Sequence, residues 1–171
     1  MKEISEHVSD IRVMPHNIEA EQGMLGCILK GKDVEMEIAM AWIRDENAFY
    51  NTDSLNTFKA MKELYKDKVT IDVITVGDKI FEETGKKDTI YLLNLQDSVV
   101  SKSKVEHYAK IVWEKYIQRE TAKSAQDLLN ASFKNFKDVG SILEKHNRLV
   151  NELRNIQPSK IKNISDVVDE A

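Results

Sequence analysis

Gly26, Gly31 and Lys32 come closest to a catalytic motif in this sequence. Gly, four residues, Gly and Lys is the spacing of a phosphate-binding loop, whose next residue is a Ser or Thr that binds Mg²⁺. Asp33 occupies that hydroxyl position, and its carboxylate would repel phosphate. The motif also needs a loop between a strand and a helix, whereas this segment is typical of a helix. We therefore assign no nucleotide-binding site and no catalytic site.

The histidines and the single cysteine do not have the spacing of metal ligands. The histidines are scattered along the chain, and no carboxylate pair lies in a context that would form a cleft. One cysteine, Cys27, excludes a disulfide within the chain, so we expect a buried thiol. The sequence thus predicts no metal site and no cofactor in these 171 residues; its four histidines are His7, His16, His107 and His146.

The charge balance argues against a protein that grips nucleic acid through a broad basic face. The net charge is −4 and the pI is about 5.6. Acidic residues dilute the basic residues of the segment 102–123, which indicates a solvated helix face. The basic residues of that segment are Lys102, Lys104, Lys110, Lys115, Arg119 and Lys123, and a further group is Arg154, Lys160 and Lys162.

The sequence has neither a signal-peptide pattern at its N-terminus nor the roughly 18 consecutive apolar residues of a membrane span. These features indicate a cytoplasmic protein without a membrane partner. Only two prolines and 7% aromatic residues favour an all-α chain.

The first predicted helix begins after Asn17, whose side chain can accept hydrogen bonds from the first turn. Glu19 and Glu21 place negative charge at the positive end of the helix dipole. Gly23 and Gly26 each cost roughly 1 kcal/mol relative to Ala in a helix, which predicts the close approach of another backbone. The apolar face is formed by Ile18, Gln22, Leu25 and Leu29, with Met24 and Ile28 beside them.

Gly31 is predicted to close this helix and Asp33 to cap the next one. The segment 34–42 fits both the alternation of a strand and the spacing of a helix. Its Glu, Met and Ala residues favour the helix.

Three further elements precede the longest helix. Thr52 or Asp53 is predicted to cap the third helix. The β-branched residues of 69–76 favour a strand, but Asp72 is a strong N-cap, so we predict a helix from Asp72 that ends before Gly85. A fifth helix is predicted over 89–97, around Ile90, Leu93 and Leu95.

The longest predicted element begins at Ser103, which forms a capping-box pattern with Glu106. About thirty helical residues make a rod of about 45 Å, which is longer than the diameter of a small globule. Its buried face is predicted to be Val105, Tyr108, Ala109, Val112 and Tyr116 in the first half, and Ala122, Leu129, Phe133 and Phe136 in the second.

A heptad pattern follows, which predicts that the chain folds back as an antiparallel hairpin through a turn containing Asp138 and Gly140. Two helices alone bury too little surface to be stable, so such a hairpin needs another copy or another protein. The heptad residues are Val139, Ile142, His146, Leu149, Leu153 and Ile156. The residues predicted at the oligomer or partner interface are Leu129, Phe133, Phe136, Ile142, His146, Leu149 and Leu153.

The predicted fold is therefore all-α, a compact helical globule with a protruding antiparallel helical hairpin. Its parts are a flexible arm over 1–14, a globule over 15–120, a hairpin over 121–156, and a linker with the start of a connecting helix over 157–171.

Several motifs in order resemble the N-terminal domain of DnaB-family replicative DNA helicases, bacterial or phage, over residues 14–156. They are MPHNIEAEQGMLGCIL, the pair Phe49 and Tyr50, the pair Leu64 and Tyr65, IDVITV over 71–76, and YAKIV over 108–112 followed by Arg119. The resemblance implies a signature core of Ile18, Glu19, Glu21, Leu25, Gly26, Tyr108 and Val112.

The resemblance implies a six-helix globule whose hairpins pair into dimers, with three dimers forming the collar of a hexameric helicase. It implies that this fragment is not an enzyme and that ATP, Mg²⁺ and most DNA contacts belong to a RecA-like motor domain elsewhere in the parent chain. The implied partners of the collar are the helicase-binding domain of primase and, in some systems, a helicase loader.

Two other interpretations stay open from the sequence. The chain could be a free-standing helical adaptor or loader-like phage replication protein, which a stop codon after Ala171 would support. It could also be an enzyme with an unrecognised site, which ATP hydrolysis by the purified chain would support.

Overall fold

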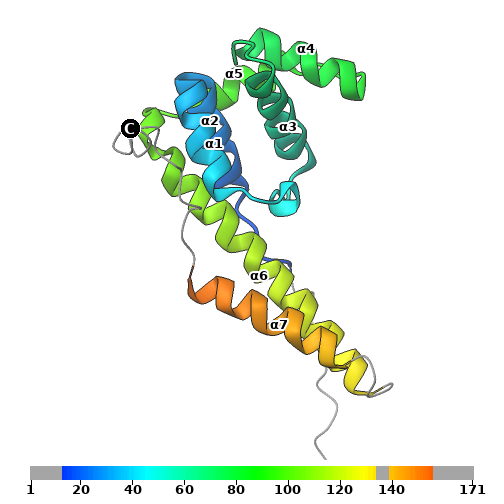
Figure 1. Ribbon diagram of the computed structural model, residues 1–171. Helices are drawn as coiled ribbons and strands as arrows, with labels where there is room; N and C mark the ends of the chain where they lie inside the picture. The colour runs from blue at the N-terminus through cyan, green and yellow to red at the C-terminus, as the bar shows by residue number, and fades with distance from the viewer. Residues whose placement is uncertain (1–12, 134–138, 156–171) are drawn as a thin grey trace, which may run out of the picture.

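The computed structural model describes residues 13–133 and 139–155, and these residues form helices without any strand (Figure 1). The all-α prediction is confirmed. Most of the predicted arm, the turn with Phe136 and Asp138, and the chain from Ile156 onward lie outside the described residues. The helices are α1 (Ile18–Gly31), α2 (Asp33–Trp42), α3 (Thr52–Lys66), α4 (Val73–Thr84), α5 (Thr89–Ser98), α6 (Val105–Ser132) and α7 (Val139–Arg154), with 3₁₀ turns η1 (Glu46–Ala48) and η2 (Lys102–Lys104).

The long helix α6 joins two parts of the molecule (Figure 1). Helices α1 and α2 pack against its first half, α3 and α5 pack against α1, and α4 packs against α3 and α5, which gives the predicted six-helix globule. Its second half extends away from the globule with α7 alongside, which is the predicted hairpin. At about 1.5 Å per residue, the 28 residues of α6 span about 42 Å.

Helix α1 is the centre of the globule. It begins as predicted, with Asn17 Oδ1 accepting a hydrogen bond from the Ala20 amide at 2.8 Å. Because α2, α3, α5 and α6 all pack against it, α1 is covered on more sides than the predicted single apolar face. Its buried residues are Ala20, Glu21, Gly23, Met24, Leu25, Gly26, Cys27, Ile28 and Leu29.

Of the two central glycines of α1, Gly26 confirms the predicted close approach of another backbone, whereas Gly23 faces a side chain. A Cβ at Gly26 would lie 2.2 Å from the backbone oxygen of Leu95, so α5 crosses α1 in backbone contact there. A Cβ at Gly23 would lie 2.9 Å from the ring of Tyr108 on α6. The glycines therefore allow both neighbouring helices to approach α1.

Replacing Gly26 with Ala is expected to lower the free energy of unfolding, because the new methyl group meets a backbone carbonyl that cannot rotate away. Overpacking costs about 1–3 kcal/mol, more than the roughly 1 kcal/mol of helix propensity that Ala adds. Urea unfolding monitored by circular dichroism measures the change. The control is Gly140→Ala on α7, where a Cβ has no neighbour within 4 Å and the substitution should stabilise. Equal effects at the two glycines would contradict the crossing.

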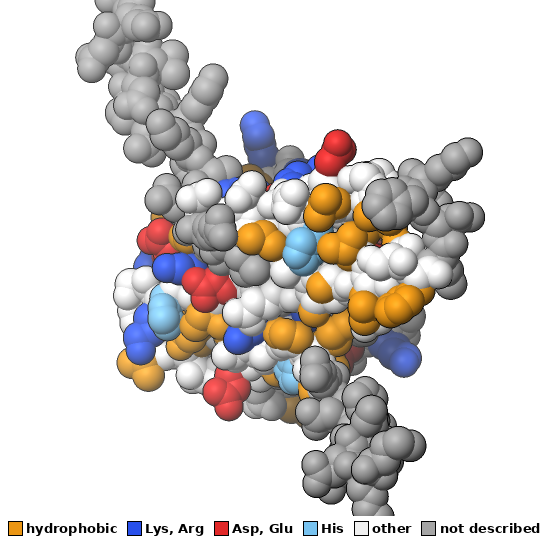
Figure 2. Space-filling view, turned by 90° about the horizontal axis from the view of Figure 1, so that it is seen from below, with side chains coloured by type: hydrophobic (Ala, Val, Ile, Leu, Met, Phe, Trp, Pro, Cys, Tyr) orange, Lys and Arg blue, Asp and Glu red, His pale blue; other side chains and the backbone are white. Residues whose placement is uncertain are grey.

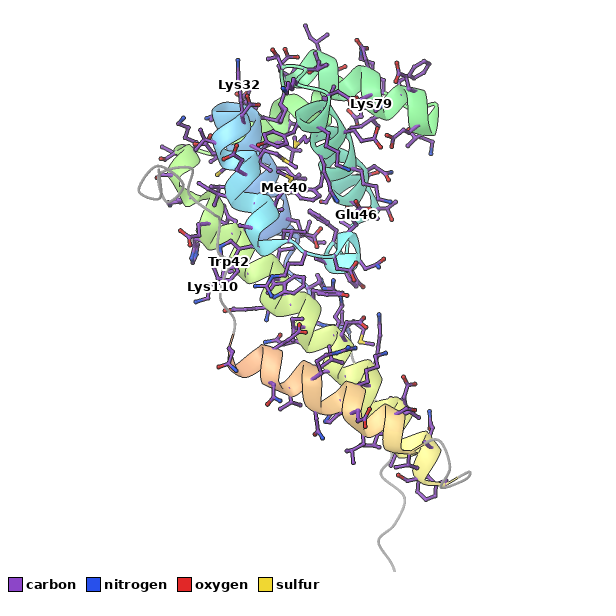
Figure 3. All side chains as sticks on the ribbon, in the orientation of Figure 1. Lys32, Met40, Trp42, Glu46, Lys79 and Lys110 are labelled. Carbon is purple, nitrogen blue, oxygen red and sulfur yellow. The ribbon has the colours of Figure 1, made fainter. Side chains whose placement is uncertain are left out.

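The corner between α1 and α2 differs from the prediction. Gly31 is the last residue of α1, and the positive φ of 62° belongs to Lys32, at the top of Figure 3. Asp33 is the first residue of α2 and not its cap. A Cβ at Gly31 would lie 1.8 Å from the carboxyl group of Glu35, so that side chain would have to move if Gly31 were replaced.

Both ends of helix α4 are confirmed, whereas the predicted cap of helix α3 is corrected. Asp72 Oδ1 accepts from the Ile74 and Thr75 amides at 2.8 and 2.9 Å, and Gly85 ends α4 with a φ of 70°. Helix α3 is capped by Asn51, one residue before the predicted choice of Thr52 or Asp53.

Helix α6 starts later than predicted. The 3₁₀ turn η2 precedes it, so α6 begins at Val105 without a side-chain cap. The Ser103 hydroxyl lies 2.9 Å from that of Ser101 instead of forming a capping box. In the first half of α6 the predicted buried face is confirmed, because Val105, Ala109 and Val112 are buried and Tyr108 and Tyr116 pack against the core.

The buried side of α5 is also corrected. Leu92 and Leu95 enter the core, whereas Ile90 and Leu93, predicted beside Leu95, are exposed. Both sides of this short helix are apolar, so periodicity did not identify which side faces the core.

Candidate functional site

The hairpin is held together along one side of α7. Leu149 is buried against α6, while Ile142 and His146 are half-buried. The predicted heptad side of α7 therefore faces α6 at these three positions. The side chain of Leu153 and the whole of Ile156 lie outside the described residues. Gly140 belongs to the first turn of α7 and not to the connecting turn.

The predicted buried face in the second half of α6 is wrong for the single chain. Ala122 is exposed, Leu129 is 53% exposed and Phe133 is 83% exposed. The cause is that α7 covers only one side of α6 and leaves this stripe open. We call Leu129, Phe133 and the exposed Leu143 of α7 the hairpin face. Figure 2, seen from the hairpin end, shows hydrophobic side chains gathered on the surface.

Arg119 lies where α6 leaves the globule, and it is not on a solvated helix face as predicted. Its side chain is 5% exposed. The guanidinium donates hydrogen bonds to the backbone oxygens of Pro15 at 2.8 Å, Ala48 at 2.6 Å and Asn47 at 3.3 Å. Arg119 thus ties α6 to the segment before α1 and to the turn η1.

Other basic residues of α6 fit the predicted solvated face. Lys110, labelled in Figure 3, is exposed and lies 3.9 Å from Glu114, and Lys123 lies 2.7 Å from Glu120. Such exposed pairs contribute about 0–1 kcal/mol.

Glu21 of α1 binds the segment that follows the turn η1. Its carboxylate is buried and accepts hydrogen bonds from the backbone amides of Tyr50 at 2.7 Å and Asn51 at 3.2 Å. Burial raises the pKa of this carboxyl, and the two amide bonds and the positive charge of Arg119 oppose that rise. The carboxylate therefore fixes the start of α3.

Two tyrosines complete this arrangement. The Tyr116 hydroxyl donates to Asp45 Oδ2 at 2.6 Å, and the ring of Tyr50 stacks on His16 with centroids 4.2 Å apart. We call Glu21, Asp45, Tyr50, Tyr116 and Arg119 the base cluster. It joins α1, α6 and the segment 45–51 at the root of the hairpin, and its groups are engaged in backbone and side-chain bonds.

Spacing contains a signal for the buried charge of Arg119, which the sequence prediction missed, and for Glu21, which only the family resemblance placed in a core. Val112, Tyr116 and Arg119 follow one another at intervals of four and then three residues, so Arg119 lies on the predicted buried side of α6. Glu21 precedes Leu25 by four residues in the same way. A charge on a buried helix face indicates a buried partner.

The implied signature core is only partly buried. Glu21, Leu25, Gly26 and Val112 are buried, and Ile18 and Tyr108 are half-buried. Glu19 is exposed, which corrects its placement in the core. Its place in the first turn of α1 suits the helix dipole instead.

The near match to a phosphate-binding loop lies in α1 and at the start of α2, as predicted for a helical segment. Cys27, the second residue of this segment, is buried, and burial raises the pKa of its thiol to about 11. Among the described residues, no group of three His, Cys, Asp or Glu side chains could hold a metal ion. No described helix has the length and apolar character to cross a membrane.

Four further exposed apolar side chains lie on the globule, on the mutually packed helices α4 and α5. Ile90 is 72% exposed, and the other three residues are also open to solvent. We call Ile74, Phe81, Ile90 and Leu93 the outer patch.

Comparison with known proteins gives consistent matches. A family model described as DnaB-like helicase N terminal domain matches residues 13–114. Replicative DNA helicase DnaC of Bacillus subtilis (strain 168) is 29% identical over 163 residues, covering 92% of this chain and 35% of the relative. Replicative DNA helicase DnaB of Rhodothermus marinus is 34% identical over 116 residues, covering 63% of this chain and 12% of the relative. The chain thus spans about a third of the length of the first of these relatives, and less of the second.

Two solved structures share the fold. The N-terminal domain of DnaB helicase from Mycobacterium tuberculosis superposes with a TM-score of 0.68 at 21% identity, covering 82% of this chain and 99% of that chain. A DnaB-like replicative helicase, whose structure was described together with its interactions with primase, gives a TM-score of 0.63 at 19% identity. That match covers 90% of this chain and 35% of the other.

Proposed function

Because the chain belongs to the DnaB-like helicase N-terminal domain family, we propose that it is a non-catalytic collar domain, which assembles a replicative helicase ring and docks its partners. The hairpin face carries this proposal. The globule buries its apolar side chains around α1, whereas the hairpin leaves Leu129, Phe133 and Leu143 open to solvent. Covering them with a second hairpin would make a four-helix bundle.

Pairing of two identical hairpins has two-fold symmetry, and it stops at a dimer. A hexamer built from three such dimers therefore needs a second contact elsewhere on the globule. In the proposed parent protein, ATP, Mg²⁺ and most DNA contacts belong to a motor domain in the part of the relatives that this chain does not match.

Light scattering of the purified chain over a range of concentrations tests the proposal. We expect the mass to rise above the 19.7 kDa of one chain as the concentration increases. A mass of one chain at every concentration would count against hairpin pairing.

The outer patch is the proposed docking surface for the helicase-binding domain of primase. Its side chains lie on the globule and leave the hairpin free for self-association. The related helicase whose structure was described with primase supports a partner of this kind. A helicase loader is the other partner proposed for the collar.

Ile90→Glu is expected to weaken binding of the primase domain by about tenfold, because a carboxylate would have to be desolvated in the contact. Isothermal titration calorimetry measures the affinity. The matched control is Val34→Glu, an equally large charge change at a side chain 60% exposed on α2. Equal affinities of the two variants for the primase domain would contradict docking on the outer patch.

A further inference from the structure

Two buried polar atoms inside the hairpin have no hydrogen-bond partner. Ser124 of α6 is fully buried and its Oγ is unpaired. The Nδ1 of His146, on α7, is buried and unpaired as well. A buried polar group without a partner costs about 1–3 kcal/mol, so most such groups in proteins are hydrogen-bonded. These two atoms therefore require an explanation.

The Ser124 hydroxyl differs from the other hydroxyls in the second half of α6. Thr121 donates to the backbone oxygen of Ile117 at 2.8 Å, and Ser132 donates to that of Leu128 at 2.8 Å. This bond to the preceding turn is the usual one for a hydroxyl within a helix. Ser124 does not make it, so its hydroxyl is free for a group across the hairpin.

His146 lies near the level of Ser124 when both are counted from the helix ends at the turn of the hairpin. Helix α6 ends at Ser132 and α7 begins at Val139. Ser124 lies eight residues before the end of α6, about 12 Å, and His146 lies seven residues after the start of α7, about 10 Å. The two distances differ by less than one helical turn.

We propose that Ser124 and His146 form a buried polar layer, joined by a water-bridged hydrogen bond, which sets the register of α7 against α6. Apolar seam residues pack almost equally well after a slip of one turn, whereas a slip would separate the hydroxyl from the imidazole. A single buried polar layer fixes register in coiled coils in this way, at a cost in stability. The register belongs to the single chain, and in the proposed self-association it decides how the hairpin face is presented to a second copy.

Spin labels on Lys110→Cys and Lys145→Cys, exposed positions about 24 Å apart along the axis of the hairpin, measure the register by double electron–electron resonance. An excess of unlabelled chain restricts the measurement to distances within one chain, and Cys27 is buried. With Ser124 and His146 present we expect one narrow distance. In Ser124→Ala/His146→Leu we expect a second distance, shifted by about 5 Å, one helical turn. An unchanged distribution overturns the proposal.

Nitrogen NMR of the imidazole tests the bond itself. Ser124→Ala is expected to shift the His146 Nδ1 resonance, whereas Ser132→Ala, a control whose hydroxyl bonds within its own helix, should not. The same response to both substitutions would overturn the proposal. The distance measurement does not need an oligomer. If the second spin-label distance occurs in the double variant while light scattering finds only single chains, the register role stands and the proposed self-association fails.

Discussion

Leu129→Glu/Phe133→Glu is expected to dissociate the self-associated chain and to leave its helices folded. Both side chains are exposed in the single chain, so a glutamate at either position is solvated there. In a paired hairpin each carboxylate would have to be buried without a partner, at a cost of several kcal/mol. A loss of about 3 kcal/mol raises the dissociation constant about 100-fold. Sedimentation equilibrium measures this constant.

Val34→Glu/Lys110→Glu is the control for this substitution, since it adds negative charge at exposed positions of the globule. It should leave the dissociation constant within about twofold. Circular dichroism should show equal helix content in both variants. If the hairpin variant keeps the mass and the affinity of the unsubstituted chain, the hairpin face is not the self-association surface.

Arg119→Met is expected to lower the free energy of unfolding more than any other single substitution in the base cluster. It would leave the backbone oxygens of Pro15 and Ala48 without their donor. It would also remove the positive charge that lowers the pKa of Glu21 and so favours its ionised form. Removing one partner from a buried charged network costs about 3–5 kcal/mol. For a chain of this size that lowers the melting temperature by about 10 °C. Thermal and urea unfolding followed at 222 nm measure the change.

Lys123→Met is the matched control, four residues further along α6 and paired with Glu120 on the surface. Lys123→Met should lower the free energy of unfolding by less than about 1 kcal/mol. A double-mutant cycle with Glu21→Gln isolates the coupling between the two buried charges. Equal costs for Arg119 and Lys123, or no coupling to Glu21, would show that the base cluster does not hold the root of the hairpin.

Local chemistry allowed much of the fold to be predicted. Asn17 and Asp72 are helix caps in the structure, because a cap needs only a side chain and the amides of the next turn. Gly26 predicted a close backbone, because a helix has little other reason to accept a glycine. The corrections at Gly31 and Ser103 fall at helix ends, where a residue of positive φ and a 3₁₀ turn took the place of the predicted caps.

The sequence by itself determined that the chain is helical, where its helices lie, and that a heptad hairpin follows the globule. Those properties depend on contacts within a few residues along the chain. Only the tertiary structure decided which apolar sides are covered: Leu92 is buried and Ile90 is exposed, although both are apolar residues of α5. Likewise, Arg119 bonds to Pro15 and Ala48, which are 104 and 71 residues away in the chain. Periodicity identifies an apolar side, but burial depends on which helix packs against it, and that is set by the whole fold.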